Sequence, residues 1–260
     1  MYIKLILTLT LLVTLIEAKD SELELGLGVG SVYYPNYIGS KSTQTLSVPV
    51  PYIRYRGEYF RIDEDGINGK LFGINGLRVD LSVNGSLPAS SDDSGVRKGM
   101  PDLDLTGEIG PNLIYNIYEH GVAQLEFELP VRAVLSTDFS NIKYRGVVST
   151  PQLKYSLNYS EVEWTLRAGV IFGDEEYNNY FYEVKDKYVT PLRALYKSNS
   201  GFGGYRNRIG MTYSKNDWWA GAFVSYTNID RAVFKGSPLV ETSHAFYMGV
   251  SIAYILYGEE

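Results

Sequence analysis

Few side chains in this sequence are suited to catalysis. It has two histidines, His120 and His244, and no cysteine, which excludes disulfides, a cysteine nucleophile and a cysteine-ligated metal. His244 directly follows Ser243, and a histidine that activates a serine hydroxyl is a hydrolase arrangement if a third group orients it. A hydrolase based on His244 is therefore one hypothesis. His120 falls in a predicted tight turn, where we expect it to be solvated.

The acidic stretches do not predict a metal site. The segment "DEDGING", Asp63 to Gly69, superficially resembles a calcium loop. Its fifth position is Ile67 and its sixth Asn68, where a ligand and a glycine are required. The acids Asp174, Glu175 and Glu176 are expected in a solvated loop. We therefore predict no metal, no cofactor and no catalytic residue, and so no enzyme.

Composition points to an exported all-β protein. Residues 1–18 combine Lys4, an apolar run and Ala18, the pattern of a signal peptide, and residues 19–260 are expected to form one domain. The formal net charge of −6 argues against a nucleic-acid partner. The 23 tyrosines and 26 glycines suit strands with aromatic girdles at membrane interfaces, and no helix is expected.

Period-two alternation identifies the strands. In 244–257, large apolar residues alternate with small or polar ones. Comparable segments run about 11–15 residues, longer than most globular strands and long enough to cross a bilayer. An even number of strands is typical of bacterial outer-membrane barrels. Twelve strands are predicted, with ten as the fallback if the two short segments 58–63 and 66–73 fail: 22–34, 45–55, 58–63, 66–73, 77–87, 104–118, 121–135, 147–159, 161–173, 203–215, 218–229 and 244–257.

The connections alternate in length. Short turns fall on one side, and the others, nearly all long, lie at 35–44, 63–66, 88–103, 136–146, 174–202 and 230–243. This is the pattern of a transmembrane antiparallel up-and-down barrel, with short periplasmic turns and long outer loops. We therefore expect the chain to span the outer membrane, with outer-membrane lipid around it.

The polar face of the strands carries both signs of charge. Opposite charges on neighbouring strands stabilise each other, so we interpret the lumen as salt-bridged and closed. A selective aqueous pore is the alternative. The predicted lumen charges are Arg78, Asp80, Glu108, Glu126, Glu128, Arg132, Lys154, Glu161, Glu163, Arg167, Arg206 and Arg208.

Three loop motifs, taken in order and spacing, resemble the MipA/OmpV family of outer-membrane proteins. They are "YPNYIGS" (34–40), "GDEEYNNYFYEV" (173–184) and "SPLV" (237–240). The resemblance covers essentially the whole mature chain and implies an outer-membrane barrel without catalytic residues. Its motif residues here are Pro35, Tyr37, Gly39, Ser40, Gly173, Asp174, Tyr177, Tyr180, Phe181, Ser237 and Pro238.

The resemblance also implies a function. The family's name-giving role is that of a scaffold linking a lytic transglycosylase to a peptidoglycan synthase, and we take this as the leading hypothesis. The alternative is a surface-exposed adhesin or narrow pore that uses loops 88–103 and 174–202. A lipid-modifying outer-membrane hydrolase based on His244 is the third and least favoured hypothesis. All three motifs fall in predicted outer loops, whereas those enzymes work in the periplasm. For "YPNYIGS" we therefore expect a role in shaping or capping the outer mouth.

Overall fold

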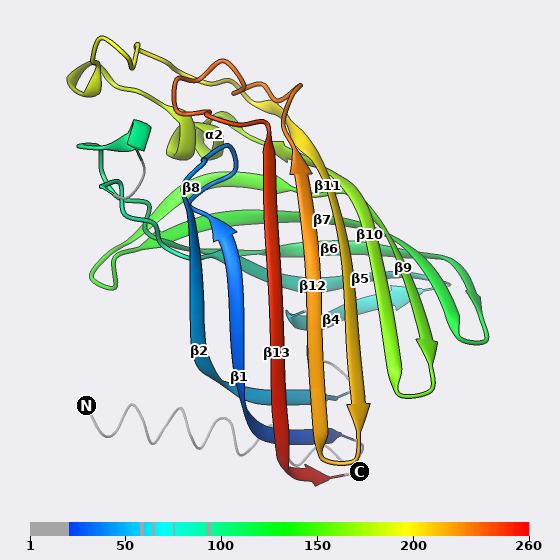
Figure 1. Cartoon of the computed structure of the whole chain (residues 1–260). Coiled ribbons are helices and arrows are strands. Elements are labelled where there is room, and N and C mark those ends of the chain that lie inside the picture. Colours follow the sequence, from blue (N-terminus) through cyan, green and yellow to red (C-terminus); the bar gives the residue numbers. More distant parts are fainter. Residues whose placement is uncertain (1–20, 58–59, 64–65, 75, 93–94, 260) are drawn as a thin grey trace.

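The strands close into one antiparallel barrel (Figure 1). The computed structural model describes residues 21–57, 60–63, 66–74, 76–92 and 95–259, so the predicted signal peptide lies outside the described residues. No helix in the described ranges is long and apolar enough to cross a membrane.

The described residues form thirteen strands. They are β1 (Glu22–Pro35), β2 (Thr43–Arg56), β3 (Phe60–Asp63), β4 (Gly66–Ile74), β5 (Leu77–Ser86), β6 (Leu105–His120), β7 (Ala123–Thr137), β8 (Ile142–Ser149), β9 (Gln152–Tyr159), β10 (Val162–Gly173), β11 (Gly201–Lys215), β12 (Trp218–Asn228) and β13 (His244–Glu259).

The first and last strands seal the barrel. β13 pairs with β1, and Ile252 lies opposite Val29 in this pairing. β10 pairs with β11, which joins the remaining strands into a closed ring. Closure leaves no open β1 or β13 edge, as a lipid environment requires. β8 and β9 both pair with β7 and together take the place of one strand in the barrel wall. The thirteen strands therefore make a twelve-stranded barrel, and that prediction is confirmed.

That interruption corrects one predicted strand. The segment 147–159 was expected to be continuous, but it starts at Ile142 and breaks between β8 and β9 at Thr150–Pro151. Proline has no backbone N–H for the ladder, so the break falls where the sequence puts Pro151. Both pieces pair with β7. The predicted long connection 136–146 therefore shortens to a turn, in which the Asp138 carboxylate accepts hydrogen bonds from the backbone of Ser140 and Asn141.

The wall is low at β3 and β4. β3 pairs with β2 only at Tyr55 and Arg56, and β4 reaches up β5 only as far as Ser82. Among the described residues, the stretch of β2 from Thr43 to Arg54 therefore has a strand partner on its β1 side alone.

One outer connection contains a helix, contrary to the expectation of none. α2 (Glu175–Tyr182) follows Asp174, whose carboxylate accepts a hydrogen bond from the Tyr177 backbone at 2.8 Å. This is an N-cap of the kind that starts helices. Short 3₁₀ turns, η1 (Gly95–Arg97) and η2 (Asp186–Tyr188), lie in the loops as well. The larger connections gather at one end of the barrel, opposite the end where β13 finishes (Figure 1).

Candidate functional site

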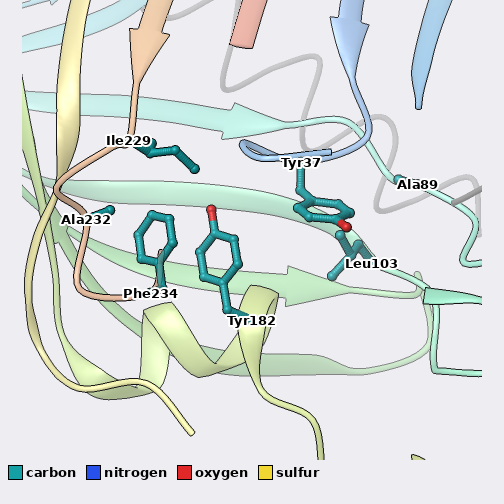
Figure 2. Packing of buried hydrophobic residues seen from close by; sticks show 7 residues of the cluster. All are labelled: Tyr37, Ala89, Leu103, Tyr182, Ile229, Ala232 and Phe234. Carbon is teal, nitrogen blue, oxygen red and sulfur yellow. The ribbon is translucent and has the colours of Figure 1, made fainter. Parts of the chain in front are cut away.

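Four outer connections meet in one apolar cluster over the barrel mouth (Figure 2). Buried apolar side chains from separate loops stabilise a common packing, because each removes apolar surface from water. We call this set the cap cluster; its buried members are Tyr37, Ala89, Leu103, Tyr182, Ile229, Ala232 and Phe234. The loops thus form a packed layer over the mouth.

Two tyrosines hold the cap cluster together. The Tyr37 hydroxyl donates to the Leu239 carbonyl at 2.7 Å, and the Tyr182 hydroxyl donates to the Ile38 carbonyl at 2.8 Å. The Tyr182 ring stacks on Phe234 with centroids 3.8 Å apart. Burial raises the pKa of both Tyr37 and Tyr182 above the ordinary phenol value, so both are neutral donors at physiological pH.

The remaining "YPNYIGS" residues shape the chain around Tyr37. Pro35 ends β1. Gly39 has φ +101°, a conformation that favours glycine, and a Cβ there would lie 3.2 Å from the Ile229 side chain. Its carbonyl accepts hydrogen bonds from the backbone of residues 241 and 242. The Ser40 hydroxyl accepts one from the Ser42 backbone at 3.0 Å.

The second motif fixes α2 against the barrel. The Asp174 carboxylate caps α2 and also accepts from the Val147 backbone at 2.9 Å, so it ties the helix to β8. The Tyr177 and Phe181 rings meet edge to face at 5.3 Å. The Tyr180 hydroxyl accepts from the Asp104 backbone at 2.8 Å. Gly173 leaves room for the Tyr177 ring, which a Cβ would approach to 2.5 Å.

The third motif completes the contact. The Ser237 hydroxyl donates to the Tyr182 carbonyl at 2.8 Å and accepts from the Leu239 backbone at 3.2 Å. Pro238 lies between Ser237 and Leu239 in the chain, and the Leu239 side chain is fully buried. The three motifs, far apart in sequence, therefore converge on Tyr182.

Two arginines in the cap, Arg97 and Arg193, are not among the residues predicted from the sequence. Arg97 is buried and donates to the carbonyls of Phe181 (2.8 Å) and Pro101 (3.2 Å). Arg193 donates to Tyr188 (2.7 Å) and Val96 (2.8 Å), among other carbonyls. A guanidinium offers five donors in a fixed fork, which suits it to joining loops. Nothing in the local sequence marks these residues, because their acceptors are backbone atoms of other loops.

Most of the predicted lumen charges lie on the inward face of the wall. Arg78 bridges Glu126 and Asp80, each at 3.0 Å. Arg132 contacts Glu108 at 3.4 Å and donates to Ser82 at 3.0 Å.

The register also places the other predicted lumen charges. Glu128 accepts a hydrogen bond from Gln152 at 2.5 Å. Glu163 lies opposite Thr212, and Arg206 opposite Gly169. The register further sets Lys154, Arg167 and Arg208 side by side on β9, β10 and β11. Glu161 lies instead in the exposed turn before β10, where it pairs with Lys215 at 3.2 Å.

The histidines do not assemble the hydrolase arrangement. His244 Nδ1 shares a hydrogen bond of 2.8 Å with the Tyr226 hydroxyl, and the two rings stack. The neighbouring Ser243 hydroxyl contacts the Lys235 ammonium instead. His120 is exposed at the end of β6, with its ring near that of Tyr118. Neither histidine contacts a serine hydroxyl through an interaction among the described residues.

Comparison with known proteins bears on this cap and barrel. The family model described as "MltA-interacting protein MipA" matches residues 27–256. The chain belongs to the MipA family. Its curated relatives include outer membrane protein Omp26La of Vibrio anguillarum and outer membrane protein OmpV of Vibrio cholerae. Each is 26% identical over 212 residues, which span 77% of this chain and 75% of the relative.

Two solved structures of outer-membrane proteins are distant matches to this MipA-family chain. The outer membrane protease OmpT from Escherichia coli has a TM-score of 0.34 and 9% identity, covering 92% of this chain and 98% of its own. The toluene transporter TodX from Pseudomonas putida has a TM-score of 0.35 and 10% identity, covering 91% and 89%. Scores this low carry no information about function. The family, the named relatives and the barrel place the chain in the outer membrane.

No metal centre is formed by the MipA-family chain in the part that the structure describes, where groups of three or more His, Asp or Glu with ligand geometry are absent. A cavity of about 730 Å³ lies on the outer side between α2 and the loop that carries Arg97. Its lining mixes cations and carboxylates, for example Lys143, Arg145, Glu175 and Glu183. It does not single out one ligand charge.

Proposed function

We propose that this outer-membrane barrel is a non-enzymatic scaffold that holds a lytic transglycosylase and, with it, a peptidoglycan synthase at the periplasmic face. The family description, MltA-interacting protein, supports a protein partner. Fold alone does not fix function, so the proposal also needs a surface at the periplasmic end.

The observation that carries the proposal is an exposed rim at the end of the barrel opposite the cap. Val122, in the turn between β6 and β7, is 50% exposed, and Tyr159, at the end of β9, is 72% exposed. Their turns adjoin, since the Val122 carbonyl accepts from the Asn158 backbone at 2.8 Å. With exposed His120 they form what we call the rim patch: His120, Val122 and Tyr159. Aromatic residues of this kind dominate the energetics of many protein interfaces.

The cap cluster weakens the pore alternative. An aqueous channel needs an open outer mouth, whereas four connections pack over this one. The cap also accounts for the position of the family motifs. They lie outside yet stabilise the barrel, so their outer placement does not conflict with a periplasmic partner.

A surface adhesin is the second candidate. Leu192 and Leu195, in the outer loop after α2, are 95% and 62% exposed. Exposed apolar side chains at a loop tip are candidates for contact with another surface. We call these two residues the loop tip.

The scaffold is tested by affinity capture of the tagged full-length chain from native membranes after chemical crosslinking. We expect a murein hydrolase or synthase to be recovered with it. A V122D/Y159D variant is expected to lose that partner, because two carboxylates would replace the apolar contacts. The matched L192D/L195D variant changes the other end of the molecule and is expected to keep it.

Repeated recovery of neither enzyme class by the unchanged protein would contradict the proposal. Loss of cell adhesion in L192D/L195D, with no murein partner recovered, would favour the adhesin. Both variants are first checked for a heat-dependent shift in gel migration, which reports a folded barrel.

A further inference from the structure

One edge of the barrel wall carries backbone groups that no other strand pairs in the described residues. Over Thr43–Arg54, β2 pairs with β1, whereas β3 pairs with β2 only at Tyr55 and Arg56. We call the backbone groups of Thr43–Arg54 that point away from β1 the β2 edge. Unpaired N–H and C=O groups are costly in a lipid environment, so the chemistry of this edge determines which molecules can contact it.

Two hydrogen bonds show which residues contribute to the β2 edge. The Ser42 carbonyl accepts from the Asn36 backbone at 3.0 Å in the turn between β1 and β2, and the Gly57 backbone donates to the Phe60 carbonyl of β3 at 2.9 Å. In an antiparallel strand, the N–H and C=O of one residue point to the same side and those of the next residue to the other. Even-numbered residues of β2 therefore bond to β1, and odd-numbered residues face away from it.

Pro49 and Pro51 are odd-numbered and therefore belong to the β2 edge. Proline has no backbone N–H, so each of them gives the edge a carbonyl acceptor without a donor. Prolines with this orientation are typical of strand edges that do not pair. A ladder between β2 and β5 would lack two donors near the centre of the stretch, and we therefore expect the β2 edge to stay free of a strand in the membrane.

The two proline carbonyls lie at the depth of the bilayer hydrocarbon. Pro49 is opposite Val29 and Pro51 is opposite Leu27 on β1, and these two apolar side chains are 60% and 66% exposed. A lipid tail offers no donor to a carbonyl at this depth. The edge therefore favours a ligand that is rich in N–H donors, and a protonated primary amine carries three.

A cavity beside Pro51 can hold a small polar group. It has a volume of about 190 Å³, and both Pro51 and Trp219 line it. The Arg54 guanidinium on the same wall lies 3.8 Å from the Glu24 carboxylate, which also accepts a hydrogen bond from the Tyr52 hydroxyl at 2.7 Å. Glu24 therefore balances the charge of Arg54, and the cavity does not exclude a second cation.

We propose that the β2 edge binds the head group of phosphatidylethanolamine, with its ammonium donating to the carbonyls of Pro49 and Pro51 while its acyl chains stay in the membrane. Ser47, the next odd-numbered residue toward the outer end, has an N–H on the same edge, which can donate to the phosphate of that head group. The zwitterionic head group thus matches an edge on which acceptors adjoin a donor. This site is separate from the rim patch, so its test does not depend on the scaffold.

The test measures lipid binding to the full-length folded barrel by native mass spectrometry, with lipids of identical acyl chains. Phosphatidylethanolamine is compared with its N,N-dimethyl derivative, which keeps one N–H, and with phosphatidylcholine, which keeps none. We expect phosphatidylethanolamine to bind at least about tenfold more tightly than phosphatidylcholine, because the latter cannot donate a hydrogen bond from its charged nitrogen. The dimethyl derivative should bind with intermediate affinity.

Proline variants locate the site. P49A/P51A adds two N–H donors to the edge, which occupy the acceptors' surroundings with like partial charge and allow pairing with another strand. We expect its preference for phosphatidylethanolamine over phosphatidylcholine to fall below about threefold. Pro111→Ala changes a proline of β6, a strand that pairs with both β5 and β7. It is the matched control and should keep the full preference.

A covalent bridge tests the same edge without changing the prolines. V48C/N84C joined by a flexible bis-maleimide spans the β2 edge toward β5 and should exclude the head group, so that the lipid preference is lost. The disulfide of V29C/I252C, at the paired seam of β1 and β13, should leave the preference unchanged.

Equal binding of phosphatidylethanolamine and phosphatidylcholine by the unchanged protein would overturn the ammonium assignment. An undiminished preference in both P49A/P51A and the bridged V48C/N84C, with a normal heat-dependent gel shift, would overturn the β2 edge as the site. Loss of the preference in Pro111→Ala to the same extent as in P49A/P51A would also contradict it, because the effect would then not be confined to this edge.

Discussion

The Tyr37 hydroxyl donates a hydrogen bond of 2.7 Å to the backbone carbonyl of Leu239, which joins the first and last outer loops of the barrel. Tyr182 adds a third loop, since its hydroxyl bonds Ile38 and its ring stacks on Phe234. The stability of the cap therefore depends on bonds between loops far apart in sequence.

Removing the Tyr37 hydroxyl should loosen the cap without unfolding the barrel. Tyr37→Phe leaves the buried Leu239 carbonyl without its donor, at a cost of about 1–3 kcal/mol. Tyr37→Ala also creates a cavity, and we expect about 3–5 kcal/mol. Hydrogen exchange in residues 229–243 measures the loss. Unchanged protection in Tyr37→Ala would show that the loops do not depend on this contact.

Alkaline pH should open the cap. Burial raises the pKa of Tyr37 and Tyr182, so both phenols are neutral in the closed cap, whereas in the open cap they ionise near pH 10. Their contribution to stability is therefore complete below about pH 10 and is lost as the pH rises further. Limited proteolysis of the loops across this range tests it. In Y37F/Y182F the alkaline opening should disappear; an identical pH profile would contradict the assignment.

Gly146 should tolerate no side chain. It has φ +97°, and a Cβ would come within 2.2 Å of the Asp174 carboxylate that caps α2. We expect Gly146→Ala to destabilise the β8–α2 junction by about 1–3 kcal/mol, measured as increased exchange in α2. Gly107→Ala is the control, because a Cβ there has no atom within 4 Å. Equal effects of the two substitutions would count against this geometry.

Introduced cysteines can test where the barrel is closed. The chain has no cysteine of its own, and Val29 lies directly opposite Ile252 across β1 and β13, a spacing near that of a disulfide. V29C/I252C should crosslink on mild oxidation and stay compact on a heated non-reducing gel. V48C/N84C, across the unpaired edge between β2 and β5, should not. Efficient crosslinking of V48C/N84C would rule out the low wall.

The barrel could be predicted from the sequence because alternation is a local property. The segment 77–87 alternates strictly, and β5 covers Leu77–Ser86. The interruption before β9 was missed, since alternation on both sides of Pro151 hides the broken ladder. The sequence also does not predict the low wall, because the two short predicted strands, 58–63 and 66–73, do not indicate over how many residues each pairs with its neighbours.

The cap and the lumen were less predictable because they depend on contacts between distant segments. The motif around Tyr37 could be noticed as a unit, but not its contact with Leu239. Arg97 could not be identified, because its acceptors are backbone carbonyls of other loops. The side-by-side placement of Lys154, Arg167 and Arg208 depends on strand register, which places Arg167 opposite both of the others. A one-residue shift would turn such side chains to the other face.

The scaffold is tested most directly by photo-crosslinking in living cells from single positions on the full-length chain. A photoreactive residue at Val122, in the rim patch, should give an adduct containing a lytic transglycosylase or peptidoglycan synthase. The same residue at Leu192, in the loop tip, should give no such adduct. The scaffold would be contradicted if the photoreactive residue at Val122 gave no adduct with a murein enzyme while the one at Leu192 gave adducts with the surface of another cell.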